Sequence, residues 1–142
     1  MFLGKYEHTL DEKYRLIIPT KFRKAIDNFV ITCGLDNCLF LYPMDEWMKI
    51  SLALKEISTT KKDNRAFTRK FFSSAIEVTL DNQGRFTLPL PLREYARLNK
   101  EVVIIGVSNR IEIWAKDLWI NYEKEITKSY EEAAEQIVDV EI

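Results

Sequence analysis

The chain has 142 residues, of which 46% are apolar and 30% charged, and its formal net charge at pH 7 is −1. These values are typical of one folded domain or two very small ones, and they exclude an intrinsically disordered chain. No apolar run approaches the roughly 20 residues that a bilayer-spanning helix needs. The first residues also lack the long apolar region of a signal peptide, so we expect a cytoplasmic protein.

The first half predicts these elements in chain order: strands over 2–10 and 15–18 joined by a tight turn, a short helix over 21–26, a hairpin of strands over 29–32 and 39–42, and a helix over roughly 46–57. Thr20 is the expected N-cap of the short helix. The second half predicts a short helix over about 65–73, strands over 76–80 and 85–88, a helix over 91–98, strands over 102–107 and 110–114, and a helix from 117 to about 137.

One stretch of the chain is written twice. Residues 9–19 read Thr-Leu-Asp-Glu-Lys-Tyr-Arg-Leu-Ile-Ile-Pro, and residues 79–89 read Thr-Leu-Asp-Asn-Gln-Gly-Arg-Phe-Thr-Leu-Pro. Further positions match in the same order, among them Trp47 with Trp119, so the chain carries an internal duplication. Half a chain rarely builds enough core alone, and we therefore expect one compact domain with a shared core. Its expected segments are a first repeat over 1–60, a connecting basic helix over 61–75, and a second repeat with a C-terminal helix over 76–142.

The charge is unevenly distributed along the chain. Residues 117–142 hold eight acidic side chains against two lysines, which leaves residues 1–116 with a net charge of about +5. Because a phosphate responds to the local field, the slightly acidic total does not exclude a nucleic-acid partner.

The repeated stretch carries a pattern suited to anion binding. Asp11 and Asp81 each open a turn, where a carboxylate accepts hydrogen bonds from backbone amides two or three residues on and locks the turn. Gly84 stands where the second turn needs positive φ. Arg15 and Arg85 begin the returning strands, so we expect each guanidinium to point in a fixed direction, ready to bind phosphate or guanine edges.

Two observations leave other interpretations of these turns open. The aspartate and arginine of each turn can instead pair with each other or hold the two halves together. The turns also differ, because Tyr14 stands in the place of Gly84. A bulky residue at positive φ costs on the order of 1 kcal/mol, so the first turn is expected to differ from the second or to be strained.

Several motifs in a fixed order resemble the MraZ family, bacterial transcription factors with a duplicated AbrB-type fold. They are the paired turns, Gly-Arg-Phe-Thr-Leu-Pro at 84–89, Arg-Ala-Phe-Thr-Arg-Lys-Phe-Phe-Ser-Ser-Ala at 65–75, and Glu-Ile-Trp at 112–114 followed by Trp119. The resemblance covers residues 1 to about 123. It implies an α+β fold in which two AbrB-like repeats form an internally duplicated, swapped-hairpin β-barrel with flanking helices.

The resemblance also implies a function and partners. Members of the family bind double-stranded DNA as ring-shaped homo-oligomers, at short repeated G-rich boxes upstream of the division and cell-wall gene cluster, and often repress their own operon. This implies a nucleoid-associated regulator without a membrane or small-molecule partner. The alternative is an antitoxin-like or scaffolding module of the same superfamily that binds a protein.

The family's Asp-x-x-x-Arg signature matches both copies of the turn. Its usual lysine is kept only in the first copy, as Lys13, and its usual glycine only in the second, as Gly84. The resemblance therefore favours the first copy as the stronger phosphate contact. The candidate residues are Lys13, Arg15 and Arg85 for DNA binding, and Asp11, Asp81 and Gly84 for locking the turns.

A second basic patch lies on the predicted central helix. It comprises Lys61, Lys62, Arg65 and Arg69. It is either a second DNA contact or a solvated or subunit-contacting helix, and we favour the latter. Arg23 and Arg93 coincide in the duplication, and we expect them to pack across the core or to pair with acids.

Other chemistry-bearing residues favour structural roles. We expect the three tryptophans in the core or in an interface, and His8 making ordinary strand-end hydrogen bonds. Cys33 and Cys38 lack the partners of a four-ligand zinc set. The chain has no glycine-rich phosphate loop, nucleophile elbow or usable catalytic set, so we predict no enzyme activity, catalytic residue, metal or cofactor.

Overall fold

The computed structural model describes residues 1–142, and its elements follow the order that the duplication predicts. The first half supplies β1 (Lys5–Thr9), β2 (Arg15–Ile17), α1 (Thr20–Arg23), β3 (Asn28–Cys33), β4 (Leu39–Pro43) and α2 (Met44–Lys55). Helix α3 (Lys62–Ser73) follows. The second half supplies β5 (Ile76–Thr79), β6 (Arg85–Thr87), α4 (Leu90–Tyr95), β7 (Glu101–Val107), β8 (Arg110–Ala115), α5 (Lys116–Lys128) and α6 (Tyr130–Glu135).

The strands of the two halves interleave. Six of them form an antiparallel sheet in the order β1-β7-β8-β4-β3-β5, and β2 pairs with β6 in a separate two-stranded ribbon. The counterparts in the two halves are β1 and β5, β3 and β7, and β4 and β8. When each strand is replaced by its counterpart, the strand order of the six-stranded sheet reads backwards. The halves are therefore related by an approximate two-fold axis, and the β4–β8 and β2–β6 pairs map onto themselves. This confirms an α+β architecture with a mostly antiparallel sheet.

Both halves contribute to the same hydrophobic core. Nineteen buried residues form one cluster, and strands β3 and β7 supply several of them. The ribbon contributes Leu16 and Phe86, which pair across it and are 0% and 4% exposed. Phe86 meets the ring of Phe29 edge-on, with ring centroids 5.0 Å apart. The β2–β6 ribbon is thus held against the sheet by side chains from both copies of the repeated stretch.

A second cluster lies beneath the long helices. Trp114 and Trp119 are buried there, 5.2 Å apart between ring centroids, and Trp47 stacks on Phe71 of α3 at 5.4 Å. These positions agree with the predicted core role of the tryptophans. Thr32 on β3 donates its hydroxyl hydrogen to the carbonyl oxygen of Phe71 at 2.6 Å, which ties the end of α3 to the sheet.

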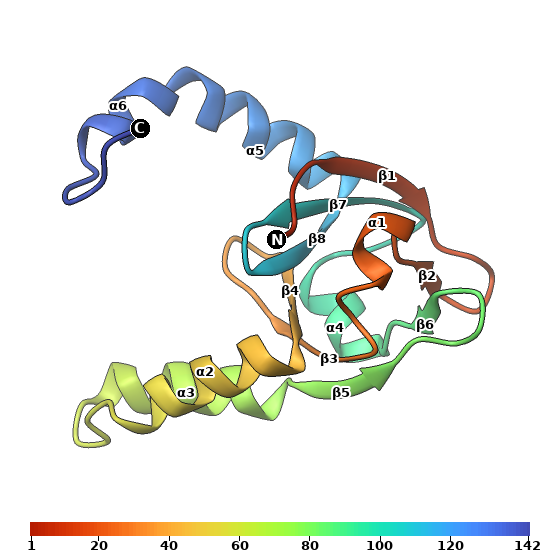
Figure 1. Cartoon of the computed structure of the whole chain (residues 1–142), viewed down its shortest axis with the longest axis horizontal. Helices are drawn as coiled ribbons and strands as arrows, with labels where there is room; N and C mark the ends of the chain where they lie inside the picture. Colours follow the sequence, from red (N-terminus) through yellow and green to blue (C-terminus); the bar gives the residue numbers. More distant parts are fainter.

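Three separate regions of the molecule are visible in Figure 1. The β2–β6 ribbon lies at one end, while α2 and α3 pack side by side into an arm at the other end. Helices α5 and α6 form a second arm, which lies in the upper part of Figure 1 while α2 and α3 lie in the lower part, and both arms pack on the second cluster. None of the helices combines the length and the apolar composition of a membrane span.

Two helix predictions were wrong in detail. Pro19, not Thr20, takes the N-cap position of α1, and no side chain caps that helix, because the fixed φ of proline already suits the entry into the first turn. The predicted helix over 117–137 is interrupted at Ser129, where α5 ends and α6 begins. Ser129 has φ −104° and ψ 8°, outside the helical region, and so separates the two helices.

The first strand is also shorter than predicted. Gly4 adopts φ +93° and interrupts the extended backbone between Phe2 and β1. Phe2 instead forms an isolated bridge to Ser108, with backbone hydrogen bonds of 2.8 and 2.9 Å. The start of the chain is therefore fixed to the β7–β8 turn, and the Phe2 side chain is buried in the main core.

Candidate nucleic-acid interface

The first turn is locked by the carboxylate of Asp11. One oxygen, Oδ1, accepts hydrogen bonds from the backbone N–H groups of Lys13 and Arg15, both at 2.9 Å. The other, Oδ2, accepts from Arg15 Nε at 2.6 Å. The carboxylate thus fixes both the turn and the direction of the guanidinium, as the spacing of the two residues predicts.

The second turn repeats this geometry atom by atom. Asp81 Oδ1 accepts from the backbone N–H groups of Gln83 at 2.8 Å and Arg85 at 2.9 Å, and Oδ2 accepts from Arg85 Nε at 3.0 Å. The predicted aspartate–arginine pairing is therefore present in both turns, but it uses only the Nε of each arginine. The terminal Nη nitrogens of Arg15 and Arg85 donate no hydrogen bond within the chain, so they are free to bind an external anion.

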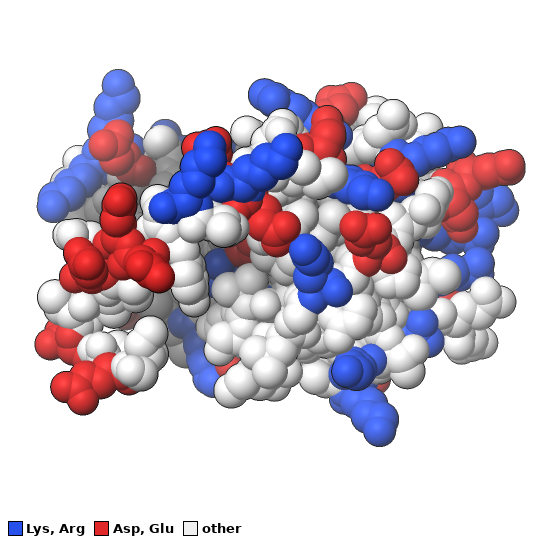
Figure 2. Space-filling view, turned by 90° about the horizontal axis from the view of Figure 1, so that it is seen from above, with Lys and Arg blue, Asp and Glu red and all other residues white.

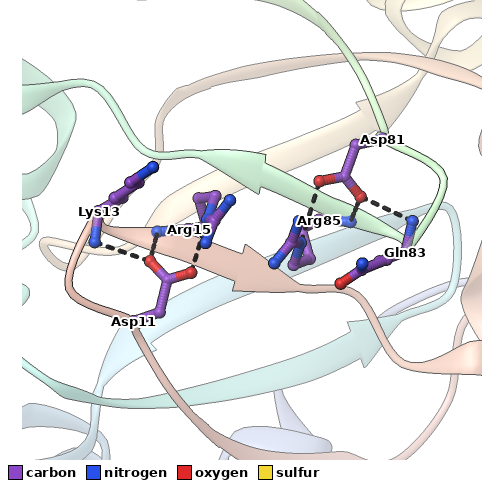
Figure 3. A network of polar contacts seen from close by, with 6 residues as sticks. All are labelled: Asp11, Lys13, Arg15, Asp81, Gln83 and Arg85. Carbon is purple, nitrogen blue, oxygen red and sulfur yellow. Dashed lines mark hydrogen bonds and ion pairs between the residues drawn. The ribbon is translucent and has the colours of Figure 1, made fainter.

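The ribbon places both arginines on one face. Arg15 lies opposite Thr87, and Arg85 opposite Ile17, so the two arginines are diagonal neighbours on the face away from the core. Their side chains are 30% and 21% exposed, which means that neither is enclosed in the core. Figure 3 shows them side by side near the middle of the ribbon, with Lys13 and Gln83 at its two ends. Two rigid guanidinium groups at one exposed surface suit a repeating polyanion.

The two turns keep the same backbone despite the difference between Tyr14 and Gly84. Gly84 adopts φ +74° as predicted, and Tyr14 adopts φ +57°, so the first turn is the strained one and is not rebuilt. In each turn the residue at this position accepts a backbone hydrogen bond from the other half, because Ile18 donates to the Gly84 carbonyl oxygen and Leu88 to that of Tyr14, both at 3.0 Å.

Arg23 and Arg93 support the turn of the opposite half. Each donates from Nε to the carbonyl oxygen before a proline, Arg23 to Ile18 at 2.8 Å and Arg93 to Leu88 at 3.0 Å. The Arg93 guanidinium lies 3.6 Å from the centre of the Tyr14 ring. Arg23 lies against Gly84, where an added Cβ would come within 2.3 Å of its Nε. The sequence predicts that these arginines pack across the core or pair with acids; instead each contacts the turn of the other half, and neither forms an ion pair.

This role explains why the two turns differ in sequence. A glycine at position 84 leaves room for the Arg23 side chain, and a tyrosine at position 14 offers its ring face to Arg93, a favourable cation–π contact. Sequence reasoning missed this function of the two arginines. The signal that could have found it is their coincidence in the duplication, four residues after each proline.

The basic patch on α3 lies far from the ribbon. The structure places Lys61, Lys62, Arg65 and Arg69 on the arm of α2 and α3, at the other end of the molecule in Figure 1. Arg65 donates from Nη1 to the carbonyl oxygens of Thr59 and Thr60, both at 3.1 Å. The structure thus brings together the residues of the two turns and leaves this patch as a separate surface.

The buried carboxylate of the interior, that of Glu112, has its partners within the chain. Glu112 is buried and accepts from Arg110 Nη2 at 2.7 Å and from Trp114 Nε1 at 3.1 Å. Burial raises the pKa of the Cys38 thiol, and burial together with Arg23 lowers that of His8. No three His, Cys, Asp or Glu side chains lie close enough together to hold a metal ion.

Because of the carboxylates of Asp11 and Asp81, the stability of the ribbon depends on pH in the acidic range. Hydrogen bonds from the backbone N–H of Arg15 and of Arg85, followed by the other donors of each turn, lower the pKa of Asp11 and Asp81 below the ordinary value of 3.8. A lowered folded-state pKa stabilises the fold above the ordinary pKa, and this stabilisation is lost as pH falls through the lower value. We expect the melting temperature to drop below about pH 4, with a flatter acid limb in D11N/D81N. D27N/D63N is the matched control, since neither aspartate accepts a hydrogen bond. An unchanged acid limb in D11N/D81N would contradict the locking role.

The chain matches the model of a known protein family. The family model described as "MraZ protein, putative antitoxin-like" matches the chain twice, over residues 1–70 and 71–141. Two successive matches fit the internal duplication, and their boundary falls inside α3.

Proteins named Transcriptional regulator MraZ are similar to the chain over its full length. Those of Natranaerobius thermophilus and Syntrophomonas wolfei subsp. wolfei are each 54% identical over 143 residues and cover 100% of both chains. That of Pelotomaculum thermopropionicum is 54% identical and covers 100% of this chain and 99% of its own. The interleaved duplication, the paired Asp-x-x-x-Arg turns and these matches together show that the chain belongs to the MraZ family.

Proposed function

We propose that this protein is a transcriptional regulator that binds double-stranded DNA through the β2–β6 ribbon. The observation that carries the proposal is the pair of arginines on one exposed face, each held through Nε with its Nη nitrogens free. Lys13 adds an exposed cation at one end of the same ribbon. The relatives' name, transcriptional regulator, supports DNA as the polyanion.

We further propose the finer features that the family resemblance implies. The protein acts as a ring-shaped homo-oligomer on repeated boxes upstream of the division and cell-wall gene cluster, represses its own operon, and resides in the cytoplasm on the nucleoid. One ribbon offers only a few phosphate contacts, so useful affinity requires several subunits that engage several boxes at once. That the interleaved strands close into a barrel stays a prediction. The division into segments 1–60, 61–75 and 76–142 stays a prediction as well.

A mobility-shift experiment on the protein's own promoter tests this proposal. We expect a fragment with tandem boxes to bind about 100-fold or more tighter than the same fragment with one box left intact, because linked contacts add avidity. The control is a fragment of equal length without boxes. Equal affinity for all three fragments would contradict sequence-specific binding by an oligomer.

An antitoxin-like or scaffolding role is the second candidate. The words "antitoxin-like" in the description of the matching family model support it. In that case the ribbon would be a structural device, and a protein would be the functional partner. Affinity purification from the native cell separates the two. Recovery of one protein at a fixed stoichiometry, without salt-sensitive DNA binding, would replace the regulator proposal.

A further inference from the structure

The arm of α2 and α3 carries a hollow that the DNA-binding proposal does not use. It lies where the two helices meet their connecting loop, with a volume of about 280 Å³. Two apolar side chains, Leu54 and Ile57, line it together with the cationic Arg65 and Arg69, and the rest of its lining is polar: Ser58, Thr59, Asn64 and Thr68. Arg69 is exposed and makes no hydrogen bond or ion pair within the chain. We call this feature the arm pocket, a hollow with two apolar side chains at its wall and two cationic groups.

The end of the chain has the complementary character. Residues 129–142 hold five acidic side chains and no lysine or arginine. The last six residues read Ile-Val-Asp-Val-Glu-Ile, and their apolar side chains are 59% to 109% exposed. The two acids of these last six residues, Asp139 and Glu141, accept no hydrogen bond with their side chains. Figure 2 shows acidic side chains gathered at the end of the molecule where α6 lies. We call residues 137–142 the acidic tail.

The duplication explains why an apolar surface is left open near the tail. In the first half, α2 is covered by α3, whose Phe71 stacks on Trp47. In the second half, α5 is followed only by the short α6, and Trp119, Ile126 and Tyr130 line an open groove. The indole Nε1 of Trp119 is buried without a partner. The C-terminal arm therefore lacks the helical cover that its counterpart has within the chain.

The acidic tail does not occupy the arm pocket of its own subunit in the structure. In Figure 1 the arm of α2 and α3 and the arm of α5 and α6 point away from the sheet separately, one below the other, and the apolar side chains of the tail are 59% to 109% exposed. Each subunit thus exposes one acidic, apolar segment and one cationic pocket. Two unlike surfaces on every copy generate a head-to-tail contact, which closes into a ring when the rotation allows it.

We propose that the acidic tail of one subunit docks into the arm pocket of a second copy of this chain. The valine and isoleucine side chains enter the hollow, while Asp139 and Glu141 pair with Arg65 and Arg69 at its rim. Leu54 and Ile57 distinguish this occupant from a DNA phosphate, which would leave these two side chains without a partner. This inference rests on the homo-oligomer of the proposed function and identifies the surfaces that build it.

The test uses two variants of the full chain and their mixture. One variant ends after Gln136 and lacks the tail; the other carries R65E/R69E and lacks the cationic rim. Light scattering after gel filtration measures the mass of each. We expect the wild type at several times the subunit mass of 16.8 kDa, and each variant alone at a single subunit. We expect the mixture at two subunits, because the intact pocket of the first variant accepts the intact tail of the second.

The mixture keeps the test independent of folding defects, since only folded partners restore a dimer. The matched control is K21E/K24E, which reverses two exposed charges outside both surfaces and should keep the wild-type mass. Wild-type mass in either variant, or a mixture that stays monomeric, would overturn the docking proposal. If R65E/R69E keeps the wild-type oligomer mass but loses DNA affinity, the pocket is a DNA contact instead. DNA binding by the ribbon is measured separately, so its failure leaves the docking result readable.

Discussion

Replacing Arg15 and Arg85 together with glutamine is expected to weaken promoter binding by two orders of magnitude or more. Each well-placed arginine fork contributes about 1–3 kcal/mol, which corresponds to roughly 5- to 150-fold in affinity per arginine. Glutamine keeps a polar side chain, but it is shorter and has neither the charge nor the fork. The measurement is a titration of tandem-box DNA by fluorescence anisotropy at fixed salt.

The control for this experiment carries the same change in net charge elsewhere. K124Q/K128Q removes two exposed cations from α5, far from the ribbon in Figure 1. Its affinity should lie within a few-fold of the wild type. R15K/R85K separates charge from geometry, because lysine keeps the positive charge without the fork. Wild-type affinity in R15Q/R85Q would refute the role of the ribbon arginines.

Truncating Phe86 to alanine is expected to lower the free energy of unfolding by about 3–5 kcal/mol. Phe86 is 4% exposed, faces Leu16 across the ribbon and packs edge-on against Phe29. Its removal leaves a cavity directly beneath the arginines. Because a domain of this size is stable by only about 5–15 kcal/mol, the loss removes a large share of the total.

Urea unfolding followed by tryptophan fluorescence measures this effect. Phe86→Leu is the matched control, since it keeps most of the apolar volume and should cost clearly less. Leu90→Ala removes an exposed apolar side chain from α4 and should change stability little. A loss below 1 kcal/mol for Phe86→Ala would mean that the ribbon is not anchored through its buried pair.

The local chemistry of the site was readable from the sequence. The Asp-x-x-x-Arg spacing predicts both locked turns, because an aspartate at the start of a turn accepts hydrogen bonds from the backbone N–H groups two and four residues later. The positive φ of Gly84 follows from the same turn geometry. The offset of the duplication predicts that both halves use the same elements in the same order, and two matches to one family model agree with it.

The features that depend on the other half were not readable. Tyr14 keeps the strained conformation because Arg93, distant in sequence, lies over its ring. The last helix breaks at Ser129, where the backbone leaves the helical region at φ −104° and ψ 8°, and apolar periodicity does not signal this break. The diagonal placement of the two arginines depends on the register of β2 against β6, a contact between residues about 70 positions apart.

The salt dependence of DNA affinity tests the central claim most directly, because it counts the phosphates that the protein neutralises. The logarithm of the binding constant falls by about 0.9 for each phosphate per unit of log salt, so six contacts give a slope near −5. The account predicts that the slope becomes shallower in R15Q/R85Q, by up to about 1.8 for every engaged subunit, and stays unchanged in K124Q/K128Q. Equal slopes for the wild type and R15Q/R85Q would contradict the claim that the ribbon arginines contact the DNA backbone.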